Sequence, residues 1–167
     1  ILLTGATGYV GGLLLPALSR KFRHIKCMTR NPRSIAAGLE DGVTAVYGDT
    51  TDHDSLEEAM EGVDDAFYLV HSLGDSDDFE ELEAQSAKNF GAAAAKSGVK
   101  RIIFLGALSQ TEKEDSSKHM ASRHRTGELL RHSGVPTIEF RASVVIGAGS
   151  MPFEAVRALV ERLPIMV

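Results

Sequence analysis

Glycines at positions 5, 8 and 11 form the clearest chemical pattern in the sequence. They belong to segment 4–12, Thr-Gly-Ala-Thr-Gly-Tyr-Val-Gly-Gly, which follows an apolar run and begins a helical pattern. Where such a turn joins a strand to a helix, backbone N–H groups and the helix dipole favour a phosphate anion. Gly-x-x-Gly-x-x-Gly spacing lets the backbone approach a pyrophosphate and the helix pack on the sheet. The segment therefore predicts a dinucleotide-binding turn; the alternative is a glycine-rich turn without a ligand.

Two arginines follow the second apolar run, in the sequence Met-Thr-Arg-Asn-Pro-Arg at 28–33. A carboxylate at the end of the second strand typically binds the ribose 2′-hydroxyl of NAD, whereas a basic residue accommodates the 2′-phosphate of NADP. This stretch holds Arg30 and Arg33 and no carboxylate. We therefore expect NADP(H) to be preferred, with NAD(H) as the second candidate. The alternative is that both arginines are ordinary surface residues.

A third group of residues could transfer or stabilise protons. His119 and Arg123 are spaced i, i+4 on a predicted helix and so share one face. Histidine exchanges a proton near neutral pH, whereas arginine keeps its charge and can only orient or stabilise. Ser109, which follows a predicted strand, is a candidate auxiliary hydroxyl. The alternatives are a solvated basic helix face and a helix-capping serine.

The elements that would position these residues alternate along the chain. Apolar runs of strand length separate helical patterns, and this alternation predicts a doubly wound parallel sheet between two helical layers. We expect a three-layer Rossmann α/β fold with about six to seven strands, formed as one domain over residues 1–167. The predicted strands are 1–4, 24–29, 43–47, 64–70, 100–105 and 135–140, and the predicted helices are 9–20, 32–38, 54–60, 77–97, 118–132 and 153–162.

Composition narrows the classes of function. Of the 167 residues, 43% are hydrophobic and 25% charged, which is usual for a globular domain. A net charge of -5 argues against a nucleic-acid-binding surface, and no apolar run approaches the length of a membrane span. The single cysteine, Cys27, fits a cytoplasmic protein without disulfides. We expect no metal site, because the acidic run at 75–83 suits the start of a helix.

The chain begins at Ile1 without Met and stops on the apolar run 164–167. Both ends resemble cuts through secondary structure. We therefore expect a piece of a longer protein, with the substrate lobe largely absent and the cofactor cleft open.

Several further segments carry a resemblance to a known family. Gly48-Asp49 follows the third strand, Val70-His71-Ser72 follows the fourth, and the segments 105–109 and 141–147 follow the fifth and sixth. Together with the glycine turn, they resemble the atypical and extended short-chain dehydrogenase/reductases over nearly the whole chain. Within that family the sequence is most similar to NmrA-like and sugar-nucleotide-epimerase-like members.

The resemblance implies a set of cofactor contacts. Asp49 would contact the adenine, and the segment around Val70 would run beside the ribose and phosphates. The residues expected to bind the dinucleotide are Gly5, Thr7, Gly8, Tyr9, Val10, Gly11, Arg30, Arg33, Asp49, Thr50, Val70, His71, Gly106 and Ala107.

The catalytic motif of the family is missing. Its members use Tyr-x-x-x-Lys, but the residues four positions after the three tyrosines here are Leu13, Thr51 and Ser72. His119 and Arg123 stand at the matching positions, and Ser109 stands where the family places its catalytic Ser or Thr.

Two classes of function stay open. The first is the NADP(H)-binding domain of a reductase or epimerase-like enzyme acting on a carbonyl or sugar-like small molecule. The second is a non-catalytic NmrA-like sensor or assembly factor that holds NADP(H). The missing Tyr and Lys favour the second class, and the epimerase-like segments favour the first. The sequence leaves the oligomeric state open.

Overall fold

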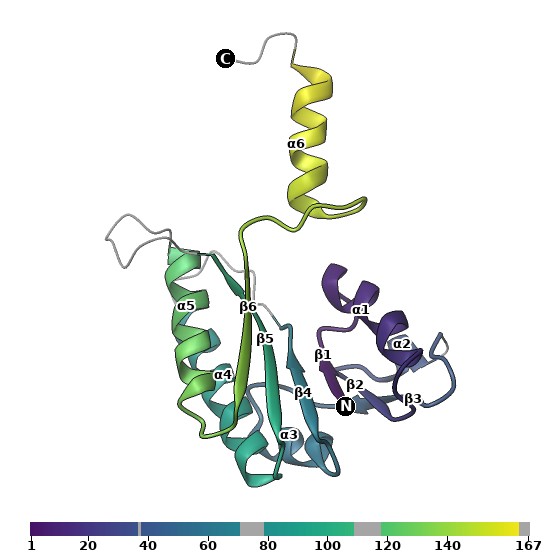
Figure 1. Ribbon diagram of the computed structural model, residues 1–167, viewed down its shortest axis with the longest axis vertical. Coiled ribbons are helices and arrows are strands. Elements are labelled where there is room, and N and C mark those ends of the chain that lie inside the picture. The colour runs from purple at the N-terminus through teal and green to yellow at the C-terminus, as the bar shows by residue number, and fades with distance from the viewer. Residues whose placement is uncertain (37, 71–78, 109–117, 164–167) are drawn as a thin grey trace.

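The computed structural model describes residues 1–36, 38–70, 79–108 and 118–163, except for the side chains of Lys118 and His119. Strands and helices alternate throughout these ranges, as the sequence predicts, and their ends differ from the expected ones by at most two residues. The elements are β1 Leu2–Thr4, α1 Tyr9–Ser19, β2 Ile25–Thr29, α2 Arg33–Ala36, β3 Val43–Tyr47, α3 His53–Met60, β4 Asp65–Tyr68, α4 Phe79–Lys96, β5 Arg101–Ala107, α5 Lys118–Arg131, β6 Thr137–Ala142 and α6 Met151–Arg162 (Figure 1).

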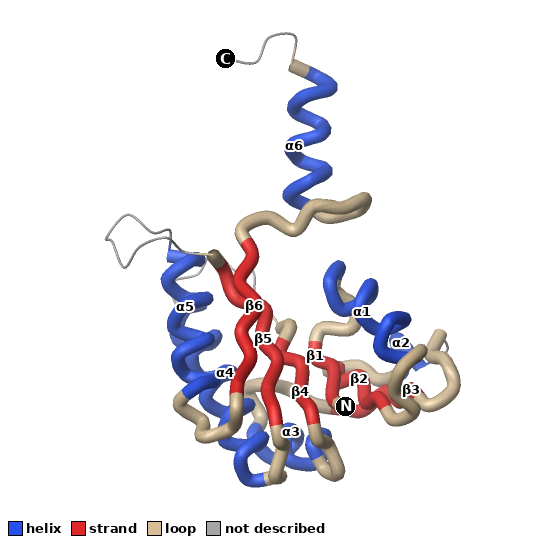
Figure 2. The backbone as a smooth tube through the Cα atoms, in the orientation of Figure 1, coloured by secondary structure: helices blue, strands red, loops and turns tan. Residues whose placement is uncertain are grey.

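The six strands form one parallel sheet in the order β3-β2-β1-β4-β5-β6 (Figure 2). This order confirms the predicted doubly wound fold. The first strand lies in the middle, where Leu3 pairs with Cys27 on one side and with Phe67 on the other. The direction of winding reverses between β1 and β4, and open α/β sheets bind ligands at the carboxyl ends of the strands beside such a reversal.

A buried hydroxyl extends the pairing of the two central strands. Thr4, the last residue of β1, donates from Oγ1 to the carbonyl of Phe67 at 2.9 Å and accepts from the N–H of Leu69 at 2.9 Å. Its side chain is fully buried. The carboxyl ends of β1 and β4 are therefore held together beyond the last backbone pair, where the chain turns toward the cleft.

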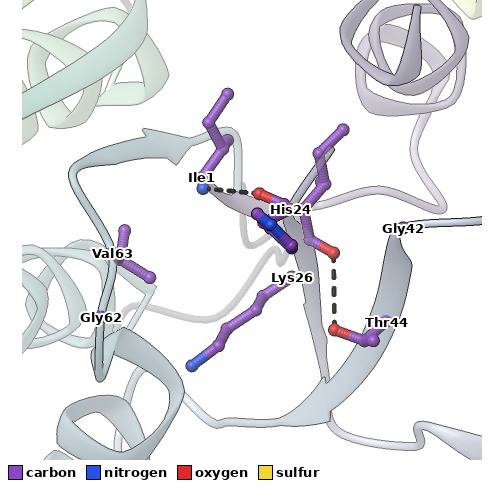
Figure 3. Close-up of a pocket in the computed structure, with 8 residues that line it drawn as sticks. Ile1, His24, Lys26, Gly42, Thr44, Gly62 and Val63 are labelled. Atoms are coloured by element: carbon purple, nitrogen blue, oxygen red, sulfur yellow. Dashed lines mark hydrogen bonds between the residues drawn. The ribbon is translucent and has the colours of Figure 1, made fainter. Parts of the chain in front are cut away.

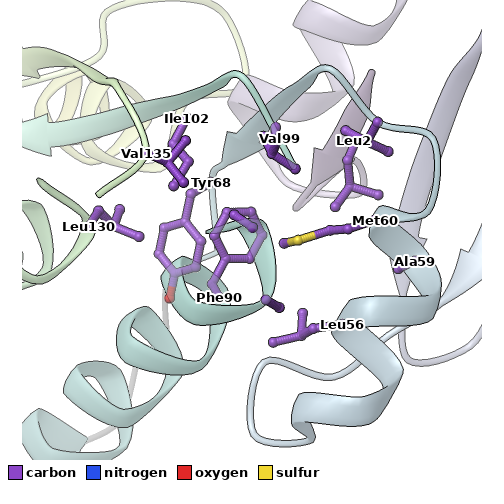
Figure 4. Packing of buried hydrophobic residues seen from close by; sticks show 14 of the residues in the cluster. Leu2, Leu56, Ala59, Met60, Tyr68, Phe90, Val99, Ile102, Leu130 and Val135 are labelled. Atoms are coloured by element: carbon purple, nitrogen blue, oxygen red, sulfur yellow. The ribbon is translucent and has the colours of Figure 1, made fainter. Parts of the chain in front are cut away.

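Helices cover the sheet on both faces. The alternation of side chains along β1 sends Leu3 toward α1 and α2, and Leu2 toward α3, α4 and α5 (Figure 1). The larger core lies on the second face, where the Tyr68 ring meets the edge of Phe90 with ring centroids 4.8 Å apart (Figure 4). Burial raises the pKa of Tyr68 above its usual value, so this phenol is a core residue.

The end of the chain is less covered. Helix α6 stands clear of the sheet (Figure 1), and none of its described residues is buried. On the outer strand β6, Ile138 and Phe140 lie on the sheet face shared with α1 and α2, and the Phe140 side chain is 61% exposed. This part of the sheet therefore presents an apolar surface that the described helices leave open.

Two glycines allow close backbone contacts around the turn that joins β1 to α1. Gly5 has a φ of 66°, which favours glycine, and a Cβ there would lie 2.8 Å from the Leu69 carbonyl oxygen. A Cβ on Gly11 would overlap the Gly5 carbonyl and the Ala6 backbone. The neighbouring Gly12 is different, because its Cβ would make an ordinary contact at 3.7 Å.

Alanine substitutions at Gly11 and Gly12 should therefore differ in their effect on the free energy of unfolding. Gly11→Ala forces α1 away from backbone that cannot yield, so we expect a loss of about 1–3 kcal/mol in the free energy of unfolding. Gly12→Ala is the matched control, and its better helix propensity should leave stability equal or higher by up to about 1 kcal/mol. Urea unfolding measures both. Equal losses for the two variants would contradict the close approach.

Candidate functional site

A cleft of about 640 Å³ opens at the carboxyl ends of the central strands. Its walls come from the segments that follow β1, β2, β3 and β4, with one side closed by α4. This is the place where a doubly wound sheet binds its ligand. The lining residues are Gly5, Ala6, Thr7, Met28, Thr29, Arg30, Asn31, Gly48, Asp49, Thr50, Thr51, Val70, Leu82 and Ser86.

The start of α1 next to this cleft lacks a side-chain cap. Its N-cap residue is Gly8, no side chain accepts from the first turn, and that turn contains no acidic residue. Helix α3 begins differently, with the Asp52 carboxylate accepting from the N–H groups of Asp54 and Ser55. The first amides of a helix have no partner within it, so those of α1 suit an anionic ligand.

The segment after β3 is ordered by its own hydrogen bonds. Asp49 Oδ1 accepts from the Thr51 N–H at 2.9 Å and from Thr51 Oγ1 at 2.8 Å. The side chain of Ser55 in turn accepts from the Asp49 N–H at 3.0 Å. Asp49 therefore lines the cleft on a turn whose conformation these hydrogen bonds stabilise.

Helix α4 supplies a wall that the sequence did not indicate. Thr50 Oγ1 donates to Ser86 Oγ at 3.1 Å, and Asn89 Nδ2 donates to the Thr50 carbonyl at 3.0 Å. Leu82, which is 46% exposed, adds an apolar surface beside them. Ser86 stands 36 residues after its partner, so no local spacing pattern reveals the contact.

The end of β2 brings a single arginine to the cleft. Arg30 is exposed and lines it, whereas Arg33 lies at the start of α2, also exposed, outside the lining. Among the described residues that line the cleft, Arg30 is the one cation and Asp49 the one carboxylate. Met28 also faces the cleft, and its side chain packs where a Cβ on Gly48 would lie.

The other predicted contacts are distributed around this cleft. Gly8, Tyr9, Val10 and Gly11 form the start of α1 beside it without lining it. Gly106 and Ala107 lie at the carboxyl end of β5, outside the lining, and Gly106 packs closely on the Glu139 side chain. His71 and Ser109 lie outside the described residues. His119 belongs to the first turn of α5, and its side chain also lies outside the described part.

Arg123 is engaged inside the fold. It is 8% exposed, and its guanidinium donates to the carbonyls of Val70 and Leu105 at the ends of β4 and β5. The same group lies 3.9 Å from the Glu83 carboxylate and 4.7 Å from the centre of the Phe104 ring. Burial lowers the pKa of Arg123, and the Glu83 charge opposes that shift. The guanidinium stays charged at neutral pH.

Arg123 lies on the buried face of α5. The face of α5 that carries Ser122, Arg123 and Thr126 packs against the sheet and α4, so these side chains are buried. Ser122 donates from Oγ to Glu83, which ties α4 to the same group. Arg123 therefore positions Val70, a wall of the cleft, and lies outside the lining itself.

A smaller hollow of about 210 Å³ lies at the opposite, amino edge of the sheet (Figure 3). The Lys26 side chain extends from β2 toward the segment that carries Gly62 (Figure 3) and donates to the carbonyls of Ala59 and Glu61. The positive charge of Lys26 therefore lies at the carboxyl end of α3, where the helix dipole is negative. The hollow has the character of a packing defect between β2 and α3.

The described residues also bear on three other possibilities, which are a metal site, a reactive thiol and a membrane-spanning helix. They contain no group of three or more His, Cys, Asp or Glu side chains placed to hold a metal ion. Burial raises the pKa of the Cys27 thiol to about 11, so it stays protonated and unreactive at neutral pH. None of the described helices is long and apolar enough to cross a membrane.

The parallel sheet, the glycine turn and the cleft beside the winding reversal define a dinucleotide-binding domain of the Rossmann class. A family model for NAD(P)H-binding proteins matches residues 5–138, and the chain belongs to this family. The resemblance to atypical short-chain dehydrogenase/reductases that the motifs predict is confirmed.

Individual relatives agree with this assignment. The chain is 31% identical over 137 residues to (4-alkanoyl-5-oxo-2,5-dihydrofuran-3-yl)methyl phosphate reductase of Streptomyces griseus, covering 81% of this chain and 44% of that protein. It is 27% identical over 136 residues to the photosystem II assembly factor Ycf39 of Cyanophora paradoxa, covering 81% and 42%. The structure of Citrobacter sp. triphenylmethane reductase complexed with NADP(H) matches with a TM-score of 0.77 and 25% identity, covering 96% and 54%. The chain thus spans about half the length of these relatives.

Removing the buried arginine should cost far more stability than removing an exposed one. Arg123→Met removes the guanidinium that lies beside the buried Glu83 carboxylate and bonds the Val70 and Leu105 carbonyls, so we expect the free energy of unfolding to fall by about 3–5 kcal/mol. Arg125 lies on the same helix as Arg123, and Arg125→Met, which breaks its exposed pair with Glu81 of α4, should cost less than about 1 kcal/mol. Denaturant unfolding compares them, and similar losses would argue against a structural role for Arg123.

Proposed function

We propose that this chain is an NADP(H)-preferring cofactor domain of an atypical short-chain dehydrogenase/reductase. The observation that carries the preference is Arg30, the one cation in the described part of the cleft lining, at the end of β2 where an NAD-binding domain would carry a carboxylate. Its guanidinium would pair with the 2′-phosphate of the adenosine ribose. Arg33 lies further along and would add a weaker contribution.

The remaining residues of the cleft fit the other parts of the dinucleotide. The uncapped start of α1, with Gly5, Thr7 and Gly8 before it, would bind the pyrophosphate. Asp49 and Thr50 would contact the adenosine, beside the apolar surface of Leu82. When bound, NADP(H) would supply or accept a hydride.

The parent protein would act as a reductase or epimerase-like enzyme on a carbonyl or sugar-like small molecule, in the cytoplasm. The similarity to the Streptomyces griseus reductase supports this class. Of the three candidate catalytic residues, His119 is the strongest, because Arg123 is occupied by main-chain carbonyls. Ser109 would act as an auxiliary hydroxyl.

A second candidate is a module that holds NADP(H) without turnover. The specific observation in its favour is that Arg123, at the position of the family's catalytic lysine, serves the packing of α4 and α5. The similarity to a photosystem II assembly factor supports the same class.

Substitution of Arg30 tests the cofactor preference. NADPH should bind to the unmutated chain more tightly than NADH. Arg30→Ala removes a charge-assisted hydrogen bond that contributes about 1.5–3 kcal/mol, so NADPH affinity should fall about tenfold or more. NADH affinity should hardly change. Calorimetric titration measures both constants.

Arg20→Ala is the control for a general loss of positive charge, because Arg20 follows the far end of α1 and lies outside the lining. It should leave both affinities unchanged. Equal affinity of the unmutated chain for NADPH and NADH would refute the preference, and no binding of either would refute the cofactor assignment.

The catalytic candidate is tested on the full-length parent protein with a panel of carbonyl substrates. If the protein oxidises NADPH, His119→Phe should reduce turnover by about 100-fold or more, which is the lower range for general acid catalysis, and should leave NADPH affinity intact. His124→Phe, an exposed change on the same helix, serves as the control. Unchanged turnover would exclude His119 as the acid, and NADPH binding without oxidation across the panel would support the non-catalytic module.

A further inference from the structure

The side chain of Tyr9 joins the start of α1 to a distant segment. This segment, residues 143–150, connects β6 to α6 and is called here the β6–α6 connection. A Cβ on Gly147 would overlap the Tyr9 hydroxyl oxygen, and one on Gly149 would lie 3.9 Å from Tyr9 Cε2. The half-buried phenol therefore rests directly on backbone, with no side chain between.

The β6–α6 connection is a tightly bonded turn. The Ser150 N–H donates to the Gly147 carbonyl at 3.0 Å, and the Ser150 hydroxyl donates to the Val145 carbonyl. The Gly149 N–H donates to Glu154 in the first turn of α6 at 3.0 Å, a bond that lowers the pKa of the Glu154 carboxyl. Ser150 is only 1% exposed. The turn and the start of α6 therefore move as a unit.

Helix α6 depends on this turn for its direction. None of its described residues is buried, and its apolar side chains Met151, Val156 and Leu159 are more than half exposed. The body of α6 is therefore not packed against the sheet. The contact of Tyr9 with the β6–α6 connection sets the orientation of the helix.

We propose that Tyr9 is a positioning residue that couples ligand binding at the glycine turn to the orientation of the β6–α6 connection. The proposal rests on the proposed function, because the ligand that orders the start of α1 is the pyrophosphate of NADP(H). The N–H of Tyr9 belongs to the uncapped first turn, and its side chain holds Gly147 and Gly149. A ligand that fixes the main chain of this residue also favours one position of its ring, and with it one position of the turn.

Hydrogen exchange with mass spectrometry tests this coupling on the chain with and without saturating NADPH. Coupling free energies between sites typically correspond to factors of about 5–150, so NADPH should slow exchange in residues 143–154 about fivefold or more. In Tyr9→Ala, at an NADPH concentration that calorimetry shows to saturate the variant, the slowing should disappear. Leu13→Ala, an exposed change on the same helix, should retain it.

A pair of substitutions tests the contact from the opposite side. Gly147→Ala adds a methyl group that overlaps the Tyr9 hydroxyl, so the slowing should be lost. The double variant Tyr9→Phe/Gly147→Ala should recover it, because the next atom of Tyr9, Cζ, would lie 3.5 Å from that methyl group, an ordinary contact. A purely structural glycine would show no such rescue. This pair carries the test if circular dichroism shows that Tyr9→Ala is unfolded.

A second probe separates the pyrophosphate from the nicotinamide. 2′-Phospho-ADP-ribose carries the pyrophosphate and the 2′-phosphate without the nicotinamide, and it should slow exchange in residues 143–154 as NADPH does. Slowing by NADPH alone would overturn the proposal in favour of direct contact with the nicotinamide. NADPH binding with unchanged exchange would also overturn it and leave the proposed function intact. If calorimetry shows no NADPH binding, the proposed function fails and this coupling fails with it.

Discussion

The close backbone approach of α1 to the end of β1 is the constraint on which this domain depends. Gly11 permits it, because a Cβ there would meet main-chain atoms of Gly5 and Ala6 that cannot move aside, and Gly5 permits the matching contact of the turn with Leu69 after β4. The approach sets the start of the helix at the carboxyl edge of the sheet, beside the cleft. It also fixes the place of Tyr9, whose ring reaches the β6–α6 connection. The close packing of α1 on the end of β1 thus positions both the proposed phosphate site and the Tyr9 contact with the β6–α6 connection.

A second theme is the use of buried polar groups to hold strand ends. Thr4 joins β1 to β4, and Arg123 joins β4 to β5 through main-chain carbonyls. Parallel strands end without partners for their last backbone groups, and each unpaired buried group is costly. At these ends a side chain supplies the missing bond. In the case of Arg123, a proposed catalytic residue also holds in place the wall of the site that Val70 forms.

Local patterns in the sequence predicted the parts of the site that are built locally. The glycine spacing located the turn, and the basic stretch after β2 located Arg30, because each depends on residues adjacent in the chain. The wall formed by Leu82 and Ser86 was missed, since it depends on how α4 crosses a segment 36 residues earlier. The i, i+4 spacing placed Arg123 correctly on a helix face. It could not indicate that this face meets carbonyls of two strands, because backbone acceptors leave no mark in the sequence.

The central position of β1 has a consequence for how the protein is made. Leu2 pairs with Ala66, so one of the two partners of the central strand lies about 60 residues further along the chain. At a synthesis rate of about 5–20 residues per second, β1 waits roughly 3–12 s on the ribosome before β4 emerges. During that interval the edge of β1 that will pair with β4 has no strand beside it, because β4 has not yet been synthesised. The topology that creates the ligand site thereby also creates the period in which the nascent chain is most exposed to wrong pairing.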